Sequence, residues 1–157
     1  EELCKMYEMI YGLNVTICRF YNVYGNFMPR EGEYRTLIPI FLQQYRDGES
    51  LTITGDGEQR RDFTHVDDII DAMIKVFQLN KWGSVYELGR GENHSINEVA
   101  DMFRFGELPH DTPPIKYIDS IPGEVRNTLC KSELARKKLN WNPTINLKDW
   151  ITEEINK

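Results

Sequence analysis

G-D-G-E-Q-R-R-D-F-T-H-V-D-D, the stretch from Gly55 to Asp68, decides the fold because it joins a turn, an extended segment and the start of a helix. The closely spaced glycines predict the turn. We expect a short extended segment at Asp62–Thr64 and a strongly amphipathic helix at Val66–Leu79. The apolar stripe of that helix consists of Val66, Ile69, Ile70, Met73, Ile74 and Phe77.

A second distinctive stretch lies upstream, where R-F-Y-N-V-Y-G runs from Arg19 to Gly25. β-Branched residues directly before it predict a strand at Asn14–Phe20. Apolar residues at helical spacing predict a helix at residues 1–12, which Gly12 ends. That helix has no N-terminal cap signal, so we expect its start to lie upstream of Glu1.

Further helices and strands alternate along the rest of the chain. Ser95-Ile96-Asn97-Glu98 matches a capping box, and Asn146 is a second helix-capping residue. The predicted helices cover residues 37–45, 95–105, 132–139 and 147–155, and the predicted strands cover 51–54, 84–88 and 115–118. This alternation predicts an α/β fold.

Composition places the chain among ordinary globular proteins. Its 157 residues are 40% hydrophobic and 28% charged, which suits one domain's worth of chain. A net charge of −6 argues against a nucleic-acid partner. No apolar run approaches the roughly 18 residues of a membrane span, so we expect no membrane association. Three cysteines without paired spacing favour a cytoplasmic protein, and three scattered histidines argue against a metal site.

Together the two quoted stretches resemble the C-terminal part of the extended short-chain dehydrogenase/reductases, the NAD-dependent nucleotide-sugar epimerases and dehydratases. The resemblance covers essentially the whole chain and is closest to UDP-glucose 4-epimerases. It implies that residues 1–35 are the tail of a Rossmann-like NAD-binding domain. Residues 36–157 would then form a small α/β substrate-binding cap, with 66–90 able to return to the Rossmann sheet.

Two hallmarks of that family are missing from the sequence. Members carry a glycine-rich NAD loop and a catalytic Tyr-x-x-x-Lys pair, and this chain contains neither. We therefore assign no catalytic residue and expect the pair to lie upstream of Glu1. By itself the chain is expected neither to bind NAD measurably nor to turn over substrate.

Asn22 is the first candidate binding residue. It directly follows a predicted strand, where ligands bind in open α/β sheets. An asparagine there can equally hold the backbone of a turn. The resemblance implies that Asn22 binds the diphosphate of a nucleotide sugar, and that Phe20, Tyr21 and Val23 line the nicotinamide pocket of NAD.

Arginines provide the other candidate diphosphate ligands. A guanidinium can grip a diphosphate with its planar fork, although salt bridges to nearby acidic residues are an equal alternative. The resemblance selects Arg61 as the diphosphate ligand and leaves Arg60 exposed. Where many relatives have an arginine, this chain has Ile121, so Arg126 becomes the candidate for the second phosphate contact. The alternative is that Arg126 forms a surface ion pair.

Leu37, Thr52 and Thr54 match segments that lie beside the nucleotide base in the family. Thr54 replaces the aromatic residue that is usual there, which weakens base stacking. Both segments could equally be plain core.

The resemblance implies a parent enzyme that epimerises a UDP-sugar at C4 with NAD and forms a homodimer. Alternatives are a nucleotide-sugar dehydratase or decarboxylase, which share this cap, and a non-catalytic sugar-nucleotide-binding protein. The strand at Asn14–Phe20 should be poorly covered in this chain, because the other strands of its parallel sheet would be missing. We therefore expect the chain to self-associate.

Overall fold

The computed structural model describes residues 1–29, 32, 34–105 and 113–157. Its helices are α1 (Glu2–Tyr11), α2 (Leu37–Arg46), α3 (Val66–Gln78), α4 (Ile96–Met102), α5 (Glu133–Leu139) and α6 (Leu147–Ile155), with a short 3₁₀ helix at Phe103–Phe105. Its strands are β1 (Ile17–Phe20), β2 (Val23–Tyr24), β3 (Leu51–Thr54), β4 (Arg60–Arg61), β5 (Thr64–His65), β6 (Val85–Leu88), β7 (His94–Ser95) and β8 (Ile115–Ile118). Every helix and strand predicted from the sequence has a counterpart, with ends that shift by a few residues.

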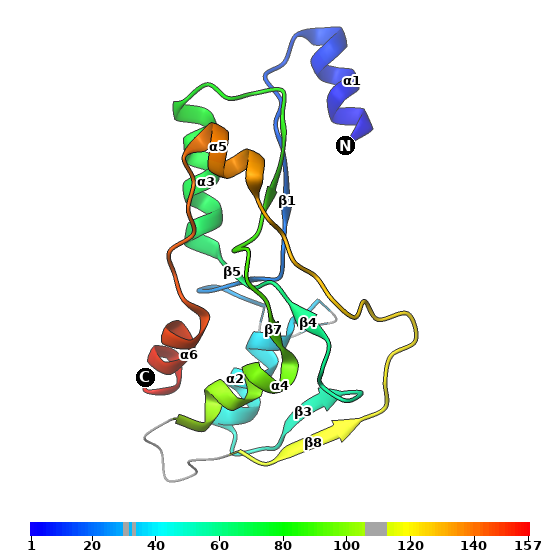
Figure 1. Ribbon diagram of the computed structural model, residues 1–157, viewed down its shortest axis with the longest axis vertical. Helices are drawn as coiled ribbons and strands as arrows, with labels where there is room; N and C mark the ends of the chain where they lie inside the picture. The colour runs from blue at the N-terminus through cyan, green and yellow to red at the C-terminus, as the bar shows by residue number, and fades with distance from the viewer. Residues whose placement is uncertain (30–31, 33, 106–112) are drawn as a thin grey trace.

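The strands pair two by two, and three of the pairs are parallel. β1 pairs with β6, β2 with β5, and β3 with β8, whereas β4 and β7 run antiparallel. Parallel partners need long crossover connections, and helices provide them here: α3 lies between β5 and β6 in the chain. Figure 1 shows the resulting elongated molecule, with β1, α3 and α5 in one half and α2, α4, β3 and β8 in the other.

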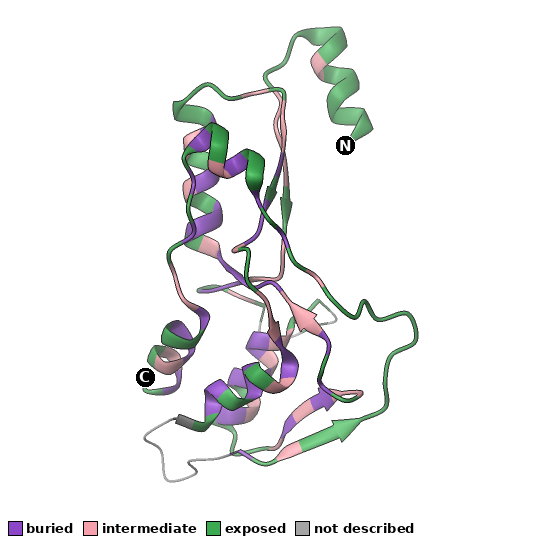
Figure 2. Ribbon diagram, viewed as in Figure 1, coloured by how far each residue is buried: buried purple, intermediate pink, exposed green. Residues whose placement is uncertain are grey.

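Each half has its own hydrophobic core, as the purple segments in Figure 2 show. The core around α2 and α4 contains Phe41, Phe103 and Ile151, which are fully buried. The core around β6 contains Tyr86, Leu88 and Trp141. The first core supports the segments that carry the candidate site described below.

Two buried carboxylates hold distant segments together. Asp62 is fully buried and accepts hydrogen bonds from the backbone N–H groups of Arg90, Gly91 and Cys130 at 2.9–3.0 Å. Asp68 accepts hydrogen bonds from the backbone of the segment before α6, at 3.0 Å from Thr144. Backbone donors compensate these carboxylates for the loss of water, so both act as structural anchors.

Helix caps follow the local signals with one difference. The capping box of Ser95 and Glu98 forms at the start of α4, and Asn146 caps α6. At α3 the cap is not the nearby threonine, Thr64, although threonine commonly caps helices. The cap is His65, whose Nδ1 accepts a hydrogen bond from the backbone N–H of Asp67 at 3.2 Å. Thr64 instead accepts a hydrogen bond from the backbone of Arg90.

Apolar side chains remain uncovered on α1 and α3. α1 stands apart from the body of the molecule in Figure 1 and buries none of its residues. Most of the predicted stripe of α3 points outward: Ile70, Met73, Ile74 and Phe77 are 45–73% exposed. The helix packs instead through Ile69, Ala72 and Val76. No helix in the described part of the chain is long and apolar enough to cross a membrane.

Candidate functional site

A cavity of about 230 Å³ contains most of the predicted ligand-binding residues, and we call it the Arg61 cavity. Its lining comes from β2, the start of α2, the end of β3, β4 and the loop before α5. The lining residues are Asn22, Val23, Thr36, Leu37, Ile38, Thr54, Gln59, Arg61, Phe63, Ile96 and Glu124. Segments that lie a hundred residues apart in sequence therefore meet at one site.

Arg61 provides the positive charge of this cavity. Its Nη2 donates to Oε1 of Glu124 at 2.9 Å, and its Nη1 donates to the carbonyl of Arg60 at 3.0 Å. The Arg61 side chain is only 15% exposed, and that of Glu124 is 30% exposed. A guanidinium so shielded from water interacts more strongly with an incoming anion than an exposed one does.

Arg60 points away from the cavity, because successive side chains of a strand alternate between its two faces. Its guanidinium donates to Oδ1 and the carbonyl of Asn93 at 2.9 and 2.8 Å, and to Glu98 at 2.9 Å. The nearby arginine lowers the pKa of Glu98. The predicted contrast between Arg61 and Arg60 therefore matches their placement, but Arg60 is held in an ion pair rather than freely exposed.

Asn22 lies beside the cavity and also holds the backbone of a neighbouring segment. It lines the Arg61 cavity, yet its Nδ2 donates to the carbonyl of Asp62 at 2.9 Å. Its backbone φ of 27° lies in the left-handed region, where asparagine is tolerated better than most residues. Asn22 thus ties the end of β1 to the segment after β4.

The predicted base-binding residues separate into two groups. Leu37 and Thr54 both line the Arg61 cavity. Thr52 lies outside it and faces α2, where its backbone N–H donates to Oε1 of Gln44 at 3.1 Å and its hydroxyl accepts from the same side chain. Thr52 therefore serves the packing of β3 against α2 in this structure.

Arg126 lines a neighbouring cavity of about 360 Å³ rather than the Arg61 cavity. Its guanidinium forms a two-pronged pair with Asp56 at 2.7 and 2.9 Å. These hydrogen bonds lower the pKa of Asp56 to about 2. Glu124, Thr54 and Gln59 line both cavities, so the two cavities adjoin.

Phe20, Tyr21 and Val23 follow one another at the carboxyl end of β1, but only Val23 lines the Arg61 cavity. Phe20 is half exposed. Desolvation and the neighbouring Cys130 raise the pKa of Tyr21. The two rings therefore flank the predicted diphosphate site without joining its cavity.

Gln59 is a lining residue that the sequence analysis missed. It lies directly before β4, and its Nε2 donates to the carbonyl of Thr54 at 2.9 Å. β4 is too short for a period of two to have identified Gln59 from the sequence. The contact of Glu124 with Arg61 could not be read from the sequence because 63 residues separate them.

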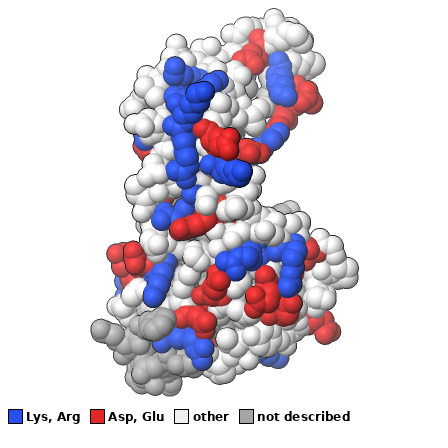
Figure 3. Space-filling model, in the orientation of Figure 1, with Lys and Arg blue, Asp and Glu red and all other residues white. Residues whose placement is uncertain are grey.

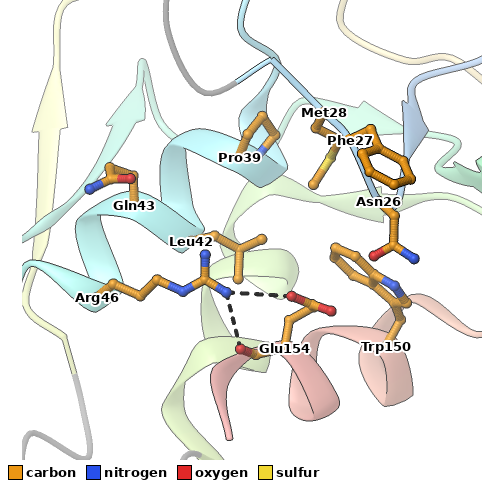
Figure 4. A pocket seen from close by; sticks show the side chains of 10 residues that line it. Asn26, Phe27, Met28, Pro39, Leu42, Gln43, Arg46, Trp150 and Glu154 are labelled. Atoms are coloured by element: carbon orange, nitrogen blue, oxygen red, sulfur yellow. Dashed lines mark hydrogen bonds and ion pairs between the residues drawn. The ribbon is translucent and has the colours of Figure 1, made fainter. Parts of the chain in front are cut away.

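A further cavity of about 410 Å³ lies between α2 and α6, and Figure 4 shows its lining. Arg46 and Glu154 form an ion pair of 3.4 Å at its rim, beside Trp150. None of the predicted site residues lines it. Arg46 is paired with a carboxylate, as Arg61 is, so ion pairing alone does not distinguish the two cavities.

Basic and acidic side chains are interspersed over the face of the molecule shown in Figure 3. Ion pairs of the described residues include Arg60–Glu98 and Arg126–Asp56. A continuous run of basic side chains also crosses the upper half of this face.

Known proteins resemble the chain over nearly its whole length. The sequence model of the NAD dependent epimerase/dehydratase family matches residues 1–89, more than half of the chain. An uncharacterized UDP-glucose epimerase of Bacillus subtilis is 31% identical over 156 residues, covering 99% of this chain and 48% of that protein. GDP-mannose 3,5-epimerase 1 of Oryza sativa subsp. indica is 31% identical over 170 residues, covering 100% of this chain and 43% of that protein.

Solved structures show the same relationship. UDP-glucose 4-epimerase of Thermotoga maritima, solved with UDP-glucose, superposes with a TM-score of 0.86 at 27% identity, covering 98% of this chain and 48% of that one. The predicted α/β fold with Rossmann-like parallel strands is thereby confirmed. The chain spans about half the length of the relatives it matches.

Proposed function

The chain belongs to the NAD-dependent epimerase/dehydratase family, and from that premise we propose that it supplies the nucleotide-sugar-binding part of a UDP-sugar 4-epimerase. The whole enzyme would be a cytoplasmic homodimer that uses NAD. Residues 1–35 would belong to its NAD-binding domain and residues 36–157 to its substrate cap. The pairing of β6 with β1 supports a return of residues 66–90 to the NAD-binding sheet.

One observation carries the proposal: Arg61 lines a cavity that Asn22, Leu37 and Thr54 also line. A diphosphate would take the place of the Glu124 carboxylate on Arg61, exchanging one charged hydrogen bond for another. The apolar lining, with Leu37, would receive the base. Binding the nucleotide in this way fixes the sugar in position and supplies binding energy remote from the reacting carbon.

NAD would supply the hydride chemistry in the whole enzyme, by accepting a hydride from C4 of the sugar and returning it. We propose that Phe20, Tyr21 and Val23 contribute an apolar wall for its nicotinamide ring. The half-exposed ring of Phe20 at the carboxyl end of β1 suits that role. The sequence contains no glycine-rich loop to bind the NAD pyrophosphate, so we expect no measurable NAD binding by this chain alone.

The residues that would bind the nucleotide do not distinguish epimerases from related enzymes. A dehydratase or decarboxylase could use the same cavity, because its residues would contact the nucleotide and not the reacting carbon. The proposal of 4-epimerisation therefore rests on likeness to UDP-glucose epimerases and on the sequence stretches at residues 19–25 and 55–68.

Titration calorimetry of the 157-residue chain with UDP and with uridine tests whether the cavity binds the diphosphate. We expect UDP to bind at least about ten-fold more tightly, because a charged hydrogen bond contributes roughly 1.5–3 kcal/mol. Equal affinities for UDP and uridine would contradict the proposal. Gln43→Ala, in the cavity between α2 and α6, is the matched control and should bind UDP as the unmodified chain does.

A further inference from the structure

The cavity between α2 and α6 is separate from the nucleotide site proposed above. Among the described residues it shares no lining residue with the Arg61 cavity. Its volume of about 410 Å³ lies in the range of small-molecule binding sites. Figure 4 shows Arg46 on one side of it and Phe27 and Trp150 on the other. Each of these three side chains has binding capacity that the described part of the chain does not use.

Phe27 is held in a conformation that packing within the described chain does not explain. Its backbone φ of 65° lies in the left-handed region, which is unfavourable for a bulky residue. Its ring lines the cavity and yet is fully exposed, at 104%, so it stands at the cavity mouth. Backbone strain of this kind is concentrated at ligand-binding sites and switch regions. A ligand that covers the ring would explain why the strained conformation is retained.

Trp150 lies in the wall of the same cavity and is only 8% exposed. The rings of Tyr24 and His65 pack against it, with centroid distances of 5.2 and 5.8 Å, and fix its position. Its indole N–H donates to no acceptor in the described part of the chain, and its nitrogen is not among the fully enclosed atoms that lack a partner. A buried tryptophan N–H usually has a partner, so an acceptor on a bound molecule would complete its hydrogen bonding.

Arg46 provides a positive charge that the fold holds only loosely. Its Nη2 donates to the carbonyl and to Oε2 of Glu154 at 3.3 and 3.4 Å. Charged hydrogen bonds of this type are normally about 2.7–2.9 Å long. The Glu154 carboxylate also accepts from Lys157, so two cations share it. A guanidinium has five N–H donors, so Arg46 retains donors for an incoming carboxylate.

We propose that this cavity binds a small aromatic carboxylate that carries a second acceptor, such as a ring hydroxyl. The carboxylate pairs with Arg46, the ring packs against Phe27, and the second acceptor receives the N–H of Trp150. Leu42 and Met28 supply apolar surface for the faces of the ring. The site is independent of the proposed nucleotide site, so either one can fail alone.

An amide chemical-shift titration of the ¹⁵N-labelled chain with 4-hydroxyphenylacetate tests the site. We expect saturable shifts at Arg46 and Trp150 and little change at Leu37 and Thr54 in the Arg61 cavity. 4-Hydroxyphenylacetamide lacks the charge and should bind about ten-fold more weakly. Phenylacetate lacks the second acceptor and should bind about three-fold more weakly.

Variants separate a role in ligand binding from a role in the fold. Arg46→Gln should remove the preference for the acid over the amide. Arg104→Gln, which removes a similarly exposed arginine paired with Asp101 outside the cavity, should keep that preference. Phe27→Asn should weaken binding about three-fold or more, yet unfold at the same urea concentration or higher, because asparagine tolerates the left-handed region. A lower urea midpoint would show that the ring serves the fold and overturn its role as a ligand contact.

The remaining outcomes decide the proposal as a whole. If the acid produces no saturable shifts, or binds no better than the amide, the proposal is overturned. Shifts confined to the Arg61 cavity, or an unchanged preference for the acid in Arg46→Gln, would overturn it as well. If Arg46→Gln does not fold, the ratio of acid to amide affinity in the unmodified chain decides. None of these results bears on UDP binding, so the proposed function is tested separately.

Discussion

Replacing Arg61 with alanine should weaken UDP binding strongly, whereas replacing Arg60 should change it little. The two residues are adjacent and carry the same charge, so long-range attraction to the ligand is nearly equal for both. Their surroundings differ: Arg61 points into the Arg61 cavity, and Arg60 is held on the opposite face by Asn93 and Glu98. The pair of substitutions therefore isolates direct contact from net charge.

The size of the effect follows from the contacts. A charged hydrogen bond contributes roughly 1.5–3 kcal/mol, and each 1.4 kcal/mol is about ten-fold in affinity, so Arg61→Ala should cost about ten-fold to a hundred-fold. The diphosphate must displace Glu124 from Arg61, which places the expected loss toward the lower end. Arg60→Ala should change UDP affinity by less than about three-fold, because rim charges contribute little to affinity.

Titration calorimetry with UDP provides the measurement, and urea unfolding of each variant shows whether the fold survives. Arg61→Lys keeps the charge but loses the planar fork, so its affinity should fall between those of the unmodified chain and Arg61→Ala. Equal losses for Arg61→Ala and Arg60→Ala, in variants of equal stability, would refute the assignment of Arg61 as the diphosphate ligand.

Four further outcomes are expected. Asp62→Ala should lower the free energy of unfolding by about 3 kcal/mol or more, because three backbone N–H groups lose their acceptor at about 1–3 kcal/mol each; a urea-derived loss below about 1 kcal/mol would contradict this. Burial lowers the pKa of His65 below its usual 6.5, so the unfolded chain takes up the proton first as the pH falls. The free energy of unfolding should therefore decline as the pH falls below 6.5. Urea unfolding at pH 7.5 and 5.5 should show a smaller decline for His65→Asn than for the unmodified chain, and equal declines would contradict this role of His65. The chain should self-associate through its uncovered apolar surface, and a concentration-independent monomer by light scattering, with strong amide-exchange protection at Val15–Arg19, would show otherwise. A coupled assay should find no 4-epimerase turnover by the chain alone, and measurable turnover would remove the reason for placing the catalytic pair outside it.

Local signals predicted most of the fold, because caps and periodicity act over a few residues. Ser95 with Glu98, Asn146 and Gly12 all mark helix ends where expected. The two-residue strands β2, β4, β5 and β7 are too short for any periodicity, and distant pairing defines them. The sequence correctly identified an apolar stripe on α3. Periodicity shows that one face of a helix is apolar, but it does not show whether another element covers that face.

The candidate site was predictable only where side-chain chemistry combined with family resemblance. That combination selected Asn22, Leu37, Thr54 and Arg61, all of which line one cavity. The ion pairs of Arg61 and Arg126 depend on partners more than 60 residues away, which no sequence spacing reveals. Whether the selected residues bind a nucleotide sugar stays a prediction.

Amide chemical-shift mapping of the ¹⁵N-labelled chain during a UDP titration tests the location of the nucleotide site most directly. We expect saturable shifts that cluster at Leu37, Thr54 and Arg61, with little change at Gln43 and Glu154 in the cavity between α2 and α6. Shifts that cluster instead at Gln43 and Glu154, or a spectrum that UDP leaves unchanged, would contradict the assignment of the Arg61 cavity as the nucleotide site.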